Sequence, residues 1–134
     1  MWKAVVAALF VLALGLGLVT LFAVEGQEVV VLRTKTPEGE VRRTRIWVAE
    51  DDGVVWIEAA DPKRKFYADL RADPDAELER GGEIHLYRAT PEPGPEGHEK
   101  IRSLLRQKYG WADLWVGAIV DTSSSIAIRL DPRS

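Results

Sequence analysis

An uncharged and almost wholly apolar stretch, residues 4–24, constrains this 134-residue chain more than any other feature. In an α-helix, a segment of this length extends about 31 Å, which matches the hydrocarbon core of a bilayer. A secretory signal peptide has a shorter apolar core and a small-residue cleavage site, and residues 21–25 (LFAVE) offer no good site of that kind. We therefore predict a short tail at residues 1–3 and an uncleaved, single-pass transmembrane anchor at residues 4–24. The side of the membrane stays open, because basic residues flank both ends of the anchor.

The rest of the chain, residues 25–134, has the length of one domain. It contains all 21 acidic residues of the chain and all but one of the 18 basic residues, so its net charge is negative. General nucleic-acid binders carry a basic surface, and the sequence therefore predicts no nucleic-acid partner. The absence of cysteine excludes disulfides, thiolate catalysis and cysteine-ligated metal centres.

The apolar pattern and the turn signals of this part predict an α+β domain. Stretches rich in β-branched or alternating apolar residues predict six strands, at residues 28–33, 40–49, 54–58, 76–79, 83–89 and 125–130. Helical spacing predicts one helix between a cap at Asp61 and a stop at Asp73, and two more at residues 98–109 and 111–120. Tight turns join the strands, which favours an antiparallel barrel or curled sheet with inserted helices over a parallel βαβ sheet.

Hydrolytic and metal-dependent chemistry has few suitable residues in this sequence. The only histidines are His85 and His98, neither lies at ligand spacing from a partner, and there is no G-x-S-x-G motif. We therefore predict neither a nucleophilic hydrolase nor a metal site.

A run of three cations, Lys63, Arg64 and Lys65, falls in the first turn of the first predicted helix. Cations at this end oppose the helix dipole, so an anion such as a phosphate would explain them. Basic residues of the second predicted strand would complete such a site: Arg42, Arg43 and Arg45. The alternative is a solvated cluster that pairs with neighbouring aspartates.

Aromatic side chains are numerous for so small a domain. Trp47, Tyr109 and Trp111 are candidates for a flat-walled pocket that takes an aromatic cofactor or a quinone. For Trp56, packing in the core is the favoured interpretation. Trp111 and Trp115 lie four residues apart on one helical face, and either cap the barrel or lie at the membrane interface near the anchor.

Four short stretches carry a resemblance to a known family: residues 39–48, 51–55, 66–74 (FYADLRADP) and 108–115 (KYGWADLW). Together with the order of elements, they resemble the deazaflavin-dependent nitroreductase and quinone reductase family. Its members are split β-barrels, more distantly related to the FMN-binding pyridoxamine-phosphate-oxidase barrels. Residues 66–74 are similar to the family pattern W-Y-x-N-L-x-A-N-P, and residues 108–115 look like a helix of its membrane-anchored members.

The resemblance implies a cofactor site. In the family, the cofactor phosphate is bound by a basic loop after the first strand, by the arginine that follows, and by the loop after the third strand. Arg42 corresponds to that arginine, and Lys63, Arg64 and Lys65 fall in the third-strand loop. The first loop differs, because Glu38 stands where the family has a basic or hydroxyl residue.

The function implied by the resemblance is that of a membrane-anchored oxidoreductase with a deazaflavin of the 8-hydroxy-5-deazaflavin type, or FMN, as its cofactor. It would reduce quinone or nitro compounds by hydride transfer, with Tyr109 as the candidate proton donor. A homodimer is compatible with it. The alternative is a non-catalytic, membrane-tethered split barrel that binds a ligand or a partner and has lost the phosphate loop.

Overall fold

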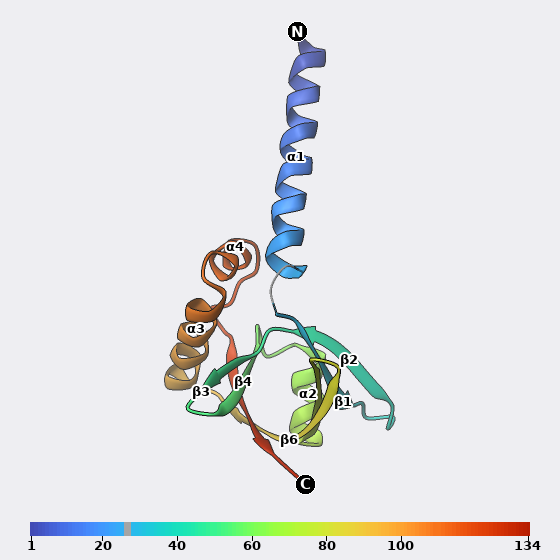
Figure 1. Ribbon diagram of the computed structural model, residues 1–134, viewed down its shortest axis with the longest axis vertical. Helices are drawn as coiled ribbons and strands as arrows, with labels where there is room; N and C mark the ends of the chain where they lie inside the picture. The colour runs from blue at the N-terminus through green and yellow to red at the C-terminus, as the bar shows by residue number, and fades with distance from the viewer. Residues whose placement is uncertain (26–27) are drawn as a thin grey trace.

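The computed structural model describes residues 1–25 and 28–134, and combines one projecting helix with a curled sheet (Figure 1). Helix α1 (Trp2–Glu25) extends away from the rest of the chain. The seven strands are β1 (Val30–Lys35), β2 (Val41–Ile46), β3 (Ala49–Asp51), β4 (Val54–Ala59), β5 (Asp75–Arg80), β6 (Glu83–Glu92) and β7 (Ile126–Pro132). The remaining helices are α2 (Lys65–Ala72), α3 (Pro95–Tyr109) and α4 (Trp111–Ile119).

The strands form one antiparallel sheet in the order β2-β1-β5-β6-β7-β4-β3. The sheet curls around α2, while α3 and α4 lie outside it (Figure 1). The predicted fold class, an α+β split antiparallel barrel, is therefore confirmed. One detail differs: the stretch predicted as a single strand at residues 40–49 divides into β2 and β3.

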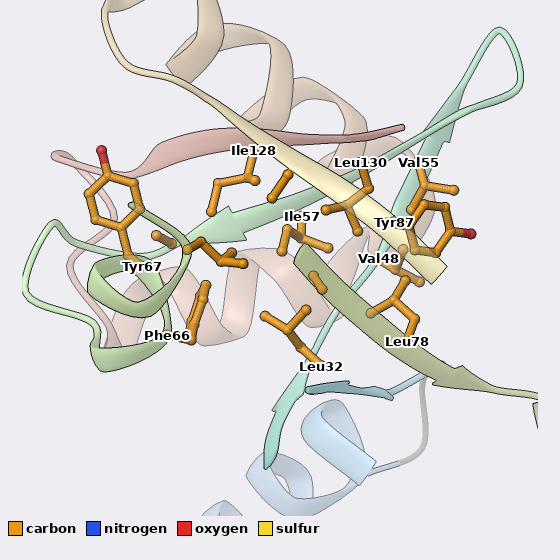
Figure 2. Packing of buried hydrophobic residues seen from close by; sticks show 14 of the residues in the cluster. Leu32, Val48, Val55, Ile57, Phe66, Tyr67, Leu78, Tyr87, Ile128 and Leu130 are labelled. Carbon is orange, nitrogen blue, oxygen red and sulfur yellow. The ribbon is translucent and has the colours of Figure 1, made fainter. Parts of the chain in front are cut away.

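The interior of the curl holds the main hydrophobic core (Figure 2). On β1, Val30, Leu32 and Thr34 are buried and alternate with residues that are partly exposed, as a strand with one face on a core requires. Helix α2 contributes Phe66 and Leu70 to the same core.

A second core lies between the outer face of the sheet and α3. Strand β4 is buried on both faces, because Ile57 belongs to the inner core and Trp56 to the outer one. Ile101 and Leu105 lie one turn apart on α3 and pack into this outer core. Helices α3 and α4 are thereby held beside the sheet.

The helix that follows the run of cations, Lys63 to Lys65, begins later in the chain than predicted. The helix begins at Lys65, and the Lys63 amide donates a hydrogen bond to the Asp61 side chain over 2.7 Å. Asp61 thus closes a short turn that precedes the helix, where the sequence predicted a helix cap. Lys63 precedes the helix, whereas Arg64 is its N-cap and Lys65 its first residue, so the dipole argument for an anion applies to Arg64 and Lys65.

Helix α1 contains the one stretch of the described chain that is long and apolar enough to cross a membrane, Trp2–Thr20, and none of that stretch is buried. A signal sequence passes the same test of length and composition. Near its end, α1 contacts α4, where the Trp115 indole donates a hydrogen bond to the Thr20 hydroxyl over 2.9 Å. The helix is therefore in contact with the domain at this end.

Candidate functional site

A pocket of about 430 Å³ lies where the edge strand β2 faces α3 and α4. This volume falls within the range of about 300–1,000 Å³ that is usual for small-molecule sites. Its apolar walls come from five separate parts of the chain, and include Val29, Ile46, Trp47, Phe66, Leu105, Val116, Gly117 and Val120. Its polar lining consists of Thr44, Arg45, Glu58, Arg64, Arg102, Asp113 and Thr122.

A buried ion cluster joins three elements at this pocket. Arg102 of α3 lies 2.9 Å from both carboxylate oxygens of Glu58 on β4, and 2.5 and 2.6 Å from those of Asp113 on α4. The Asp113 side chain is only 3% exposed. Burial by itself would lower the pKa of Arg102, but the hydrogen bonds and charges of Glu58 and then Asp113 outweigh it and raise that pKa. The cluster fixes α3 and α4 against the sheet.

Sequence reasoning did not identify this cluster. It carried one signal, because Asp113 is the only charged residue in the apolar stretch of residues 110–120. A lone carboxylate in such a stretch is normally paired when it is buried. Its partner Arg102 could not be chosen from the sequence, since several other arginines and lysines lie on α3.

The six cations predicted to bind a phosphate do not lie together. Arg64 and Arg45 line the pocket, whereas Lys63 and Lys65 do not. Among the residues that the structure describes, the Arg64 guanidinium has no hydrogen bond or ion pair. Arg64 is therefore the predicted cation that is best placed to meet an anion in the pocket.

Arg42 and Arg43 are adjacent in β2 and project from opposite faces of the strand, as neighbours in a strand do. Arg42 Nε donates a hydrogen bond to the buried Asp69 carboxylate over 2.7 Å, and Arg43 donates to Glu79 over 2.8 Å. The hydrogen bond to Asp69 raises the pKa of Arg42, and the charge of Glu38 adds to this effect. Both arginines thus have carboxylate partners away from the pocket.

The three predicted pocket aromatics also separate. Trp47 lines the pocket and stacks on Tyr109, with ring centroids 4.2 Å apart. Tyr109 is buried behind it and does not line the pocket. Trp111 is about half exposed on the outer side of α4 and does not line it either. Tyr109 therefore acts on the pocket by fixing the ring of Trp47.

The Tyr109 hydroxyl is engaged by the backbone. It accepts a hydrogen bond from the Val48 amide over 3.2 Å, and lies within donating distance of the carbonyl oxygens of Glu28, at 2.8 Å, and Val48, at 3.1 Å. Burial raises the pKa of Tyr109 to about 12, and the charge of Glu28 acts in the same direction. A hydroxyl held in this way serves to link the start of β1 to the β2–β3 bend.

We expect Tyr109 to make the stability of the full chain depend on pH in alkaline solution. An unfolded tyrosine ionises near pH 10, whereas folded Tyr109 has a pKa of about 12. Its contribution is therefore complete below pH 10 and is lost as the pH rises from about 10 to about 12. Denaturant unfolding in detergent micelles at several pH values, followed by tryptophan fluorescence, measures this.

The matched variant is Tyr109→Phe. At neutral pH it is expected to lose about 1–3 kcal/mol of unfolding free energy, because buried backbone groups lose their partner. Its stability should also decline less between pH 10 and 12 than that of the wild type. An equal decline in the two proteins would assign the alkaline loss to other groups.

No group of three or more His, Cys, Asp or Glu residues in residues 1–25 and 28–134 is arranged to bind a metal ion. The site is thus built from apolar walls, two arginines and one internally paired ion cluster. Such a lining suits a flat organic ligand that carries an anionic group.

Fold and pocket together define a split-barrel protein with a candidate binding site beside its edge strand. The model of the F420H(2)-dependent quinone reductase family matches residues 15–129. The chain therefore belongs to this family, and F420 is a deazaflavin, so the resemblance carried by the sequence motifs is confirmed. The comparison with curated proteins gave no match.

Solved structures share the fold at low sequence identity. The conserved hypothetical protein Rv2991 from Mycobacterium tuberculosis is 20% identical with a TM-score of 0.64, over 88% of this chain and 80% of that one. An F420-H2 dependent reductase (FDR-A) is 19% identical with a TM-score of 0.58, over 77% and 93%. A putative pyridoxamine 5′-phosphate oxidase from Listeria innocua is 15% identical with a TM-score of 0.60, over 85% and 90%.

Proposed function

We propose that this chain is a membrane-anchored reductase that binds a deazaflavin and reduces quinones. The observation that carries the proposal is the pocket, which joins apolar walls and the cation Arg64 in a chain of this family. When bound, the reduced cofactor supplies a hydride to the substrate. The pocket residues must then bind both partners and exclude water.

The residues present fit a deazaflavin. Its flat ring system matches the walls formed by Ile46, Trp47 and Phe66, and its phosphate matches a site that contains Arg64 and Arg45. Lys63 and Lys65 flank Arg64 in the chain and add positive charge at the same end, which attracts an anionic cofactor over a longer range. We assign Arg42 and Arg43 no direct contact with the phosphate, because each binds a carboxylate.

The chain itself orients the cofactor and keeps its surroundings dry. Trp47 provides a flat wall, and its stacking on Tyr109 fixes the plane of that wall. The Arg102 cluster holds α3 and α4 in place, so the apolar side chains Leu105 and Val116 stay in the lining. Preorganised walls of this kind position reactants without a cost at the moment of reaction.

A quinone is favoured over a soluble nitro compound by the position of the pocket relative to α1. Helix α4 lines the pocket and also contacts α1, the helix that is long and apolar enough to span a bilayer. Lipid-soluble quinones dissolve in the same bilayer. FMN carries a phosphate and a flat ring as well, so it is the alternative cofactor, and nitro compounds are the alternative substrates.

Titration of the full chain in detergent micelles with F420 and separately with FMN, followed by cofactor fluorescence, tests the proposal. We expect F420 to bind, and Arg64→Gln to weaken its binding about tenfold or more through the loss of a charge-assisted contact. The matched control is Arg43→Gln, which removes the same charge from an arginine outside the pocket.

Equal F420 affinity in Arg64→Gln and Arg43→Gln would remove Arg64 from the site. Failure of the folded wild-type chain to bind either cofactor would overturn the reductase proposal. That result would favour the non-catalytic module instead. Tighter binding of FMN than of F420 would make FMN the cofactor and would leave the proposed binding site unchanged.

A further inference from the structure

The outer face of α4 is apolar and exposed. Leu114 is 62% and Ile119 61% exposed, and Trp111 is also exposed on this helix. These residues are spaced as one helical stripe, with Ala118 beside them. Asp113, the one charged residue of the helix, is buried on the opposite side against Arg102. A stripe without charge on a short surface helix points to an apolar partner.

Helix α1 indicates what that partner is. The Trp115 indole of α4 donates a hydrogen bond to Thr20, which is the last residue of the membrane-length stretch of α1. Figure 1 shows α4 beside the end of α1 that adjoins the domain. If α1 spans a bilayer, α4 therefore lies at the level where α1 leaves it. Tryptophans such as Trp111 and Trp115 are enriched at that interface.

We propose that the outer face of α4 lies in the lipid at the bilayer surface and forms a wall between the membrane and the pocket. This inference rests on the anchor in the proposed function. Continuity with α1 favours lipid over a protein partner, because the bilayer that surrounds α1 reaches the stripe on α4. The stripe anchors the domain at a fixed height, as surface helices with one apolar face do.

The inner side of α4 faces the pocket, so the position of α4 at the bilayer bears on how a substrate enters. Asp113, Val116 and Gly117 line the pocket, and Gly117 is also exposed. A side chain at Gly117 would meet no atom within 4 Å, so the helix leaves open space at this point. An apolar substrate dissolved in the bilayer would thus reach the pocket past Gly117 without crossing bulk water.

Site-directed labelling of the full chain tests the position of α4, and the absence of native cysteine makes single labels specific. The test variants are Leu114→Cys and Ile119→Cys. The aqueous control is Val41→Cys, which is 53% exposed on the β1–β2 hairpin that points away from α1 (Figure 1). The membrane control is Leu12→Cys in α1. Each variant carries an NBD fluorophore and is reconstituted in phosphatidylcholine vesicles with nitroxide-labelled acyl chains.

We expect the labels at 114 and 119 to be blue-shifted and quenched by the lipid nitroxide, at least twofold more than the label at 41. The label at 12 should be quenched most strongly. Circular dichroism checks that each variant keeps its secondary structure. Quenching at 12 with no excess quenching at 114 and 119 would overturn the inference and leave the anchor intact.

Two further outcomes overturn it in different ways. Absence of quenching at all four positions would remove the anchor itself, and the inference with it. Blue-shifted labels at 114 and 119 that lipid nitroxides do not quench would show that a protein covers the stripe, such as a second copy of this chain. Cofactor titration in detergent does not depend on the anchor, so failure of cofactor binding and failure of this inference can be distinguished.

Discussion

Replacing Arg102 with methionine is expected to lower the free energy of unfolding of the full chain by about 3–5 kcal/mol. The substitution keeps an unbranched side chain of similar length but leaves Glu58 and Asp113 without their cation. Two largely buried carboxylates then face each other without the hydrogen bonds that Arg102 donated. Denaturant unfolding in detergent micelles at neutral pH measures the loss.

Two further variants separate the buried charge from the loss of helix contacts. Arg106→Met makes the same change one turn later on α3, at an exposed residue, and should alter stability by about 0.5 kcal/mol or less. Combining Arg102→Met with Glu58→Gln and Asp113→Asn should recover most of the loss, because no unpaired charge stays buried. If Arg102→Met costs no more than Arg106→Met, the cluster does not fix α3 and α4.

Local patterns were sufficient to predict most of the fold. Strand β7 was predicted from the alternation of residues 125–130, and tight turns were predicted between the strands. Asp52 and Gly53, between β3 and β4, both adopt positive φ, as a tight hairpin turn requires. The division of residues 40–49 into β2 and β3 was not predicted. Trp47 and Val48 continue the apolar pattern through the bend, and the bend depends on the distant hydroxyl of Tyr109.

Less of the candidate site than of the fold could be derived from the sequence. Alternation along β2 already implied that Arg42 and Arg43 project from opposite faces, so this separation could be derived from the sequence. The partner of Arg42 could not be derived from the sequence. Asp69 is 27 residues away and also accepts a hydrogen bond from Thr34 over 2.8 Å, an arrangement that only the curled sheet creates.

The start of α2 shows how one local signal serves two structures. Asp61 followed by Pro62 suits a helix cap, and it equally suits the turn that the chain forms there. Because the chain forms the turn, Arg64 is the residue before the helix and not part of its first turn as predicted. From this position it lines the pocket. The position of Arg64 at the N-cap of α2 and in the lining of the pocket keeps it a candidate for binding an anion.

Replacing Gly97 with alanine is expected to lower the free energy of unfolding by about 2–3 kcal/mol. A Cβ at this position would lie far inside contact distance of the backbone oxygen of Glu92. The backbone of Glu92 cannot yield easily, because this residue ends β6 and pairs with Ala127 of β7. The start of α3 must therefore move away from the sheet. Unfolding in detergent micelles measures the cost.

The matched control is Gly117→Ala, which adds the same methyl group to a helix where nothing lies within 4 Å. It is expected to raise stability by about 0.5–1 kcal/mol, the usual gain of alanine over glycine inside a helix. The displacement of α3 in Gly97→Ala should also weaken F420 binding, because α3 carries Arg102 and Leu105 to the pocket. Equal stability of the two alanine variants would mean that α3 tolerates a shift, and that close approach at Gly97 does not determine its position.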